Sequence, residues 1–475
     1  MSSGIRLLAV AAVALIAAAA VLVYVLSYLR FSQSGQENVV VLNVTGVTFY
    51  YESPEWHCLT HLNESKLVRE CWGEKTLYSF TLSNGTTRTI ESMHLKHPPD
   101  VVDRVVEVMD FDKMVVYEYE ELTPIKYKYI ETGMENYVLR RAIGPTPLEL
   151  RWVTPFSPHS DISGAVVFDG SRVLMPVAVF VYDDVNRSLF PAPRDVTGFV
   201  VDLLDRFYAE PIEGLVGVPV EVVSVDPHKN CSWVGYNLSV DDDQNSDLID
   251  PTKISGAIRC GHGIFKVVLV RGGRLLRVDP VVGAAYGAAV PSAYTALSLA
   301  WRPSDSIGVG NMYNIDGIPH EFGHLLGFGD VYTADKSYWD EVSRFLNRGS
   351  IMDNPVKVYL EGYGETLINK LTLVDTASLL SVVWRSIAFV DAGLADRVAE
   401  RLLGYGFNAA DGSILLPTTP DGDIAEPFKS LAWMGVAYIR LDDYQITINT
   451  DLLNAMHRLA QAAQNTQQTE TPTGQ

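Results

Sequence analysis

Residues 318–330 read IPHEFGHLLGFGD, and the rest of the chain is best interpreted outward from this stretch. It places His320, Glu321 and His324 in the pattern H-E-x-x-H. Residues four positions apart lie on one face of a helix, so the two imidazoles can share one zinc ion. Glu321 could then reach a water molecule bound to that zinc. The stretch therefore predicts a helix that carries a zinc site.

The ends of this helix can also be predicted. Asp316 is placed to cap its N-terminus, and Pro319 suits the first turn. Gly327 can end the helix in a left-handed conformation that turns the chain back. Asp330 follows this turn and completes the pattern H-E-x-x-H-x-x-G-x-x-D. Because catalytic zinc usually has three protein ligands and one open position, Asp330 is the candidate third ligand.

A second motif lies downstream, where residues 349–354 read GSIMDN and place Met352 in a turn. Helix, glycine turn, third ligand and methionine turn together resemble the metzincin clan of zinc peptidases. An aspartate as third ligand is similar to the snapalysin and immune-inhibitor-A-type branches, and Tyr332 matches the D-x-Y continuation of the latter. The resemblance is close over residues 320–354 and only architectural upstream.

The resemblance implies an α+β chain with a zincin-like catalytic domain, built from a twisted mixed sheet and an active-site helix. His320, His324 and Asp330 would hold one zinc ion, and Met352 would pack beneath it as a structural floor. Glu321 would take a proton from water and pass it to the leaving amine. The implied activity is a zinc metallopeptidase that cleaves peptide or protein substrates.

Tyrosine is a further feature of some metzincins, which carry it two residues after the methionine to assist the oxyanion. Asn354 occupies that position here, so this role is vacant. Tyr332 is the candidate substitute, and a purely structural role for it is the alternative. The resemblance also implies that a segment within residues 281–299 forms an edge strand that binds the substrate backbone.

Other interpretations of these motifs stay open. H-E-x-x-H alone is short and also arises by chance on buried helices. Glu341 is the rival third ligand, but it would leave Gly327 and Met352 unexplained. The rival functions are a cell-surface binding or scaffold protein that retains a metal site, which the presence of Glu321 disfavours, and a zinc hydrolase that does not act on peptides.

An apolar stretch at residues 7–29 is long enough to cross a ~30 Å hydrocarbon core at ~1.5 Å per residue. We predict an uncleaved signal anchor in the lipid bilayer, with the catalytic domain outside the cell. The alternative is a cleaved signal peptide and a secreted protein. N-x-S/T sequons, which indicate export and a glycoprotein, begin at Asn43, Asn63, Asn84, Asn186, Asn230 and Asn237.

The 4 cysteines form two local pairs along the chain. In an oxidising compartment the simplest assignment is a disulfide between Cys58 and Cys71 and another between Cys231 and Cys260. The alternative for Cys58 is a pro-domain thiolate that blocks the zinc. The formal net charge of −20 argues against nucleic acid as a partner.

The chain of 475 residues has room for about two or three domains. We divide it into residues 1–6 as a cytoplasmic N-terminus, 7–29 as the anchor, 30–38 as a stalk, 39–150 as a β-rich domain, 151–405 as the metallopeptidase-like domain, 406–463 as a C-terminal extension and 464–475 as a disordered tail. The β-rich domain could be a spacer, a pro-domain or a binding module.

Strand and helix patterns support this division. Asn84 and Gly85 sit between two alternating runs and predict a hairpin. We also expect strands at residues 173–182, 218–225, 264–270 and 436–441, and helices at residues 195–208, 371–403 with a break near Gly393, and 451–463. Asp243, Asn245 and Asp247 alternate as in calcium loops, but the glycine and closing glutamate of an EF-hand are missing, so a solvated loop is favoured over a Ca²⁺ site.

Overall fold

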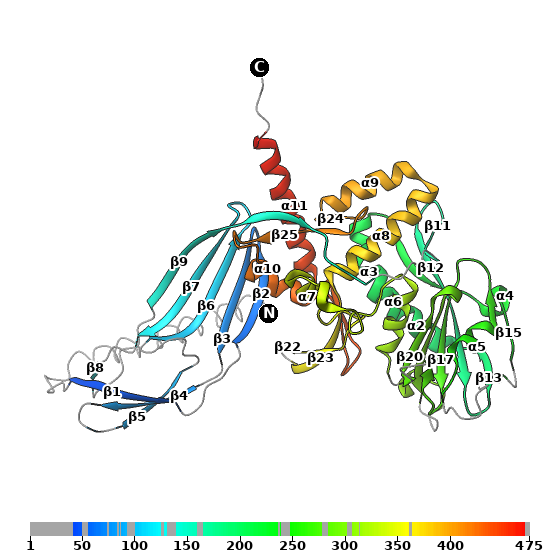
Figure 1. The fold of residues 1–475 in the computed structure, drawn as a ribbon, viewed down its shortest axis with the longest axis horizontal. Helices are drawn as coiled ribbons and strands as arrows, with labels where there is room; N and C mark the ends of the chain where they lie inside the picture. The colour runs from blue at the N-terminus through cyan, green and yellow to red at the C-terminus, as the bar shows by residue number, and fades with distance from the viewer. Residues whose placement is uncertain are drawn as a thin grey trace, which may run out of the picture. The chain divides into compact units, whose positions relative to one another are not determined.

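The structure is a computed structural model of the whole chain (Figure 1). It describes residues 41–49, 56–73, 76–82, 85, 87–92, 100–124, 128–130, 139–158, 165–235, 238, 248–277, 284–301, 306–312, 314–360 and 363–470. The predicted anchor and stalk lie outside these residues, as does nearly all of the acidic loop with its calcium-like alternation.

The chain divides into two compact units, and the first is Met1–Trp56, Trp72–Arg104 and Glu120–Arg141, which includes part of the predicted β-rich domain. Its strands form a four-stranded sheet of order β5-β4-β1-β8. They are β1 (Val41–Phe49), β4 (Thr76–Leu82), β5 (Thr87–Ser92) and β8 (Lys128–Ile130). The predicted hairpin is confirmed, because β4 and β5 pair antiparallel from Thr76↔Ser92 to Thr81↔Thr87.

The second unit is His57–Cys71, Val105–Tyr119 and Ala142–Gln475, so it takes in part of the segment that we assigned to the β-rich domain. Its segments before residue 148 belong to a five-stranded sheet of order β2-β3-β6-β7-β9, whose remaining residues are assigned to the first unit. Its strands are β2 (Trp56–Asn63), β3 (Lys66–Gly73), β6 (Asp100–Asp110), β7 (Val115–Pro124) and β9 (Leu139–Pro147). The buried side chains of Leu67 and Met109 belong to the main hydrophobic core of the second unit.

A seven-stranded mixed sheet, on the right in Figure 1, belongs to the second unit. Three parallel strands, β12 (Val173–Asp183), β17 (Phe265–Arg271) and β21 (Thr295–Trp301), lie side by side. They are rich in apolar residues and almost fully buried, as parallel strands covered on both faces usually are. At one edge, β20 (Gly287–Val290) pairs antiparallel with β21.

Shorter strands extend this sheet, and small elements connect it. The strands beside β12 are β11 (Val167–Phe168), β13 (Ser188–Pro191) and β14 (Val220–Ser224). The elements between its strands are α4 (Pro227–Asn230), β15 (Cys231–Trp233), α5 (Pro251–Gly256), β16 (Ile258–Cys260), β18 (Leu276–Arg277), β19 (Ala284–Ala285) and η2 (Pro291–Ala293). Three more short elements follow the last strand of the sheet: η3 (Val309–Asn311), η4 (Lys336–Tyr338) and α7 (Glu341–Asn347).

The predicted helix after β12 is confirmed and is longer than expected. It comprises α2 (Arg194–Leu204), a π-helical segment η1 (Asp205–Ala209) and α3 (Glu210–Val216). In α2 the buried residues Val196, Val200 and Leu203 recur at helical spacing. Gly217 ends α3 in the left-handed conformation with φ +77°.

The residues that we assigned to a C-terminal extension, 406–463, are part of the same compact unit. β22 (Val356–Leu360), β23 (Gly364–Leu371), β26 (Ala437–Arg440) and β27 (Ile446–Ile448) form one antiparallel sheet. β24 (Phe407–Asn408) and β25 (Ser413–Thr418) form another with β10 (Glu149–Val153). Because β10 pairs with β25, the predicted boundary at 150 cuts through a strand.

The predicted helical region at residues 371–403, with its break near Gly393, is confirmed. α8 (Leu373–Val390) and α9 (Ala392–Leu403) meet at Asp391, which caps α9. α10 (Glu426–Trp433) follows β25. α11 (Thr450–Glu470) continues to Glu470 within the segment 464–475 that we assigned to a disordered tail. Glutamine, which is frequent there, has a good helix propensity.

Among the described residues, α8 is the one helix long and apolar enough to span a membrane. Half of its apolar window is buried within the protein. At its start, Asp375 is 4% exposed and forms a capping box with Thr372. A buried carboxylate with protein partners is typical of a core helix.

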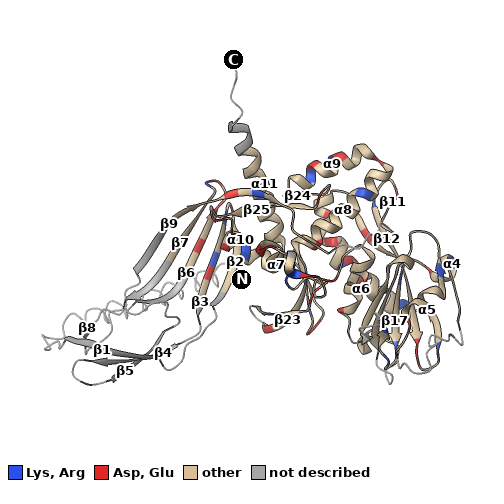
Figure 2. Cartoon of the chain, in the orientation of Figure 1, with Lys and Arg blue, Asp and Glu red and all other residues tan. Residues whose placement is uncertain are grey.

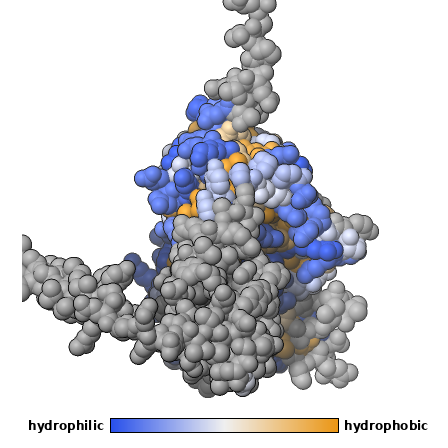
Figure 3. Space-filling model, turned by 90° about the vertical axis from the view of Figure 1, so that its left-hand side faces the viewer, coloured by the Kyte–Doolittle hydropathy of each residue, from blue (hydrophilic) through white to orange (hydrophobic). Residues whose placement is uncertain are grey.

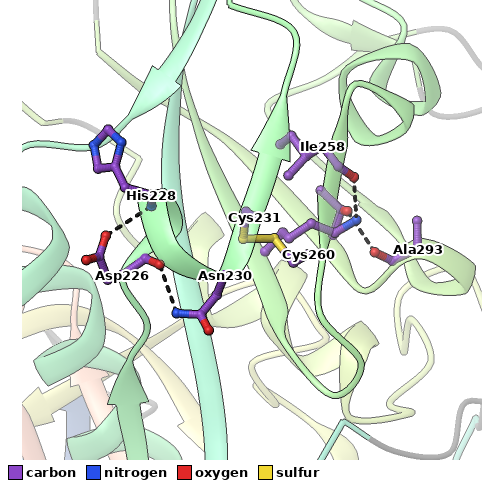
Figure 4. The surroundings of a disulfide bond; sticks show 9 residues. Asp226, His228, Asn230, Cys231, Ile258, Cys260 and Ala293 are labelled. Carbon is purple, nitrogen blue, oxygen red and sulfur yellow. Dashed lines mark hydrogen bonds between the residues drawn. A yellow bond between two sulfur atoms is a disulfide. The ribbon is translucent and has the colours of Figure 1, made fainter.

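Both predicted disulfides are confirmed, between Cys58 and Cys71 and between Cys231 and Cys260. The first excludes Cys58 as a free thiolate, so the pro-domain blocking alternative is wrong in this state. The second joins the paired strands β15 and β16 (Figure 4). Beside it, Asp226 caps α4 by accepting from the His228 backbone N–H at 3.0 Å.

The predicted α+β class is confirmed at the level of mixed helices and several sheets. The described surface carries both signs of charge, for example on α9, with Asp396, Arg397, Glu400 and Arg401 (Figure 2). In the coloured part of Figure 3, hydrophilic and hydrophobic residues lie side by side.

Candidate metal centre

α6 (Gly317–Leu325) carries the H-E-x-x-H motif and packs beside β20 and β21 of the mixed sheet. Its buried residues include Ile318, Phe322 and Leu325. The Phe322 ring lies 5.0 Å from the Phe265 ring of β17, centroid to centroid. Asp316 stands at the N-cap position as predicted, but its side chain makes no capping hydrogen bond, so that part of the prediction is wrong.

Tyr208, a buried residue of the π-helical segment η1, contacts α6 and holds it in position. The Tyr208 hydroxyl donates to the Pro319 carbonyl at 2.6 Å, and its ring lies 5.6 Å from Phe322. Gly323 permits this packing, since a Cβ there would lie 2.7 Å from Met352 Sδ and 3.0 Å from the Tyr208 hydroxyl. Met352 is fully buried, and its Sδ lies beside Gly323 in the middle of the motif helix.

The predicted glycine turn at the end of α6 is confirmed. Gly327 has φ +96°, in the left-handed region that glycine adopts without strain. The Gly327 N–H donates to the His324 carbonyl at 3.2 Å, and the Phe328 N–H donates to the Gly323 carbonyl at 3.0 Å. This pair of hydrogen bonds is a Schellman motif, and it returns the chain toward the histidines.

The turn brings Asp330 to the two histidines. Asp330 Oδ1 lies 3.4 Å from His320 Nε2 and 3.3 Å from His324 Nε2. One donor atom from each of the three side chains lies within 4.8 Å of the others, a spacing that one metal ion can bridge. The rival Glu341 is exposed in the first turn of α7 and is not part of this cluster.

Backbone carbonyls set the orientation of both imidazoles. His320 Nδ1 lies 2.7 Å from the Ile351 carbonyl, and His324 Nδ1 lies 2.9 Å from the Phe328 carbonyl. A carbonyl oxygen can only accept, so each Nδ1 carries a proton, and in the neutral ring each Nε2 keeps the lone pair that can bind a metal ion. Metal-binding histidines are commonly oriented in this way by a partner at the other ring nitrogen.

The donor set fits a divalent cation. Asp330 Oδ1 is buried and has no hydrogen-bond partner, and it faces the Nε2 atoms of both histidines. An oxygen lone pair and a nitrogen lone pair that face one another repel unless a proton or a cation lies between them. Burial opposes protonation of His320, but Asp330, Glu321 and the Ile351 carbonyl together outweigh it, so the pKa of His320 is raised to about 9. In the metal-free protein a proton on His320 Nε2 therefore lies where a cation would bind. Two imidazoles and a carboxylate are typical zinc ligands.

Glu321 is the buried carboxylate next to this cluster. It is 6% exposed, and burial raises its pKa. It lies against Gly287 of the edge strand β20, where an added Cβ would clash with Glu321 Oε1 and lie 2.8 Å from its Cδ. Glycine at position 287 therefore leaves the space that the carboxylate occupies.

Tyr332 lies on the exposed side of the site. Its ring stacks beside the His320 ring at 6.1 Å with an interplanar angle of 26°, and the residue is 46% exposed. Burial and the neighbouring Asp330 raise the pKa of its hydroxyl, so the hydroxyl stays protonated at neutral pH and can donate a hydrogen bond. This position is compatible with both of the roles considered for Tyr332.

Several residues of the site escaped the sequence analysis. Tyr208 and Gly287 contact the motif helix from segments that are distant in the sequence. Local sequence patterns do not predict contacts of this kind. Ser350 and Asp375 hold the methionine turn. The T-x-x-D pattern from Thr372 to Asp375 could have been recognised as a capping box, but not as a partner of Ser350.

No family model, curated protein or solved structure matches this chain.

Proposed function

We propose that this chain is a zinc-dependent endopeptidase of the metzincin type. The single observation that carries the proposal is the convergence of His320, His324 and Asp330 on one point, with the buried carboxylate of Glu321 beside them. The mixed sheet, the motif helix beside it and the antiparallel edge strand β20 support a zincin-like fold. In this proposal β20 binds the backbone of the substrate.

The mechanism assigns a task to each residue. His320, His324 and Asp330 would hold zinc, which activates water and polarises a peptide carbonyl. Glu321 would accept the proton of the attacking water and deliver it to the leaving amine, and its burial favours this because a raised pKa makes the carboxylate a stronger base. Asp330 contributes a negative charge that a third histidine would not.

Zinc content together with peptide hydrolysis tests this function. The purified full chain should contain about one zinc ion and cleave an unfolded protein substrate, whereas His324→Ala should lack both, because the pattern loses a ligand. Elemental analysis and gel-based cleavage are the measurements. Zinc without cleavage would favour the rival scaffold function, and cleavage of esters or amides but not peptides would favour a different hydrolase.

We further propose that the catalytic domain faces the outside of the cell on an uncleaved anchor at residues 7–29. The two disulfides support an oxidising compartment. Protease added to intact cells should release the domain, and the membrane-bound form should retain Met1 or Ser2 as its first residue. A mature N-terminus beyond Leu29 would instead indicate a signal peptide and secretion.

A further inference from the structure

We propose that Ser350 and Asp375 are positioning residues, which orient two arms of the candidate metal centre by holding the turn at residues 349–353. The inference deepens the proposed function, since it concerns the same zinc site. Neither side chain touches the three candidate ligands, so both would act through the backbone of the turn.

The turn contacts the site through two consecutive carbonyls. The Ile351 carbonyl accepts from His320 Nδ1 at 2.7 Å and so sets the direction of the ring. The Met352 carbonyl accepts from the Val331 N–H at 2.9 Å, directly after Asp330. Any rotation of this turn would therefore move both His320 and the segment that carries Asp330.

Ser350 braces the turn from within. Its fully buried hydroxyl accepts from the Met352 N–H at 3.0 Å and donates to Asp375 Oδ2 at 2.9 Å. On the other side, β23 holds the turn, since the Ile351 N–H donates to the Lys370 carbonyl at 2.6 Å. The Ser350 hydroxyl is thus the side-chain link between the methionine turn and α8.

Asp375 supplies a fixed anchor for that link. Its Oδ2 also accepts from the Thr372 N–H at 2.9 Å and from the Thr372 hydroxyl at 2.8 Å. These bonds form the capping box of α8, whose apolar residues lie in the main core. The position of the carboxylate is therefore set by a rigid element, and Ser350 transmits it to the turn.

Ser350→Ala is the decisive variant, because it removes the link and leaves the capping box of α8 intact. We expect zinc affinity to fall by about 10–100-fold, as is usual when a partner behind a metal ligand is lost. Asp375→Asn keeps the shape of the side chain but removes its charge, and it should weaken zinc binding in the same direction. Because both residues act through one hydrogen bond, the double variant should lose less than the product of the two effects.

Thr376→Val is the matched control. Thr376 is fully buried one residue after Asp375, and its hydroxyl donates only to the Thr372 carbonyl, at 2.8 Å. The Thr376→Val substitution removes a buried hydroxyl from α8 and leaves the hydrogen bonds of the turn at residues 349–353 unchanged. Chelator competition gives the zinc affinity of each full-length variant, and thermal unfolding of the metal-free protein gives its stability. We expect Ser350→Ala and Thr376→Val both to lower the unfolding temperature. Of these two, only Ser350→Ala should weaken zinc binding.

A metal-free readout separates this inference from the proposed function. In protein labelled with nitrogen-15 histidine, the Nδ1–H of His320 should exchange slowly with solvent in the wild type and at least tenfold faster in Ser350→Ala. That result would support the positioning role even if the chain cleaved no peptide. Zinc affinity within twofold of wild type together with unchanged exchange would overturn it and leave Ser350 with a purely structural role.

Discussion

Glu321→Gln should remove peptide hydrolysis while the chain still binds about one zinc ion. The amide has the shape of the carboxylate but cannot accept and return a proton, and general acid–base catalysis contributes roughly 10²–10⁴-fold to enzymatic rates. Glu321 is not one of the three clustered ligand side chains, so metal content should not change. The measurements are kcat on a peptide substrate and zinc per chain.

Gly287→Ala provides a second way to disturb the same carboxylate without altering it chemically. The new methyl group would occupy the space of Glu321 Oε1, so the carboxylate must shift. We expect kcat to fall while zinc content stays near the wild-type value. Gly198→Ala is a control for the substitution itself, because a Cβ at that helical position meets nothing within 4 Å. Full activity in both Glu321→Gln and Gly287→Ala would remove Glu321 as the proton carrier.

The local parts of the site could be predicted because their causes are local. The two histidines share a face because helix geometry requires it. The turn after them forms because Gly327 can adopt a positive φ, and its hydrogen bonds involve only neighbouring residues. For the same reason the hairpin at Asn84 and Gly85, and each disulfide between nearby cysteines, were predicted correctly.

The parts that could not be predicted depend on contacts between distant segments. β10 pairs with β25, although more than half of the chain lies between them in the sequence. The periodicity within a strand does not indicate which other strand it pairs with. The β10–β25 pairing links the predicted boundary at 150 with residues that we assigned to the C-terminal extension. Ser350 illustrates the same limit within the site, since its role follows from Asp375 lying beside it in space.

α8 shows both sides of this limit. Its helical pattern could be predicted from residues 371–403, but the contact of Asp375 with Ser350 could not, because the two residues lie 25 positions apart in the sequence. The H-E-x-x-H motif of α6 can be recognised without such contacts. A short motif can therefore be interpreted from the sequence while the scaffold around it cannot.

Asp330→Ala should weaken zinc binding far more than Glu341→Ala. Asp330 Oδ1 lies within 3.4 Å of both histidine Nε2 atoms, and removal of a charged ligand leaves a two-histidine site. Glu341 is exposed at the start of α7, where its charge contributes about 0.3–1 kcal/mol to that helix. Zinc affinity by chelator competition should therefore be close to wild type in Glu341→Ala.

Asp330→His tests the geometry of the turn rather than the identity of the ligand. If Gly327 aims residue 330 at the metal, a third imidazole at that place should retain zinc, with activity altered by the lost negative charge. Asp330→Asn is the control, because it keeps the size of the side chain but is a poorer zinc ligand. Loss of zinc in Asp330→His with full retention in Asp330→Ala would mean that residue 330 does not bind the metal. In that case the resemblance to metzincins would end at the motif helix, and the third ligand would have to come from another segment.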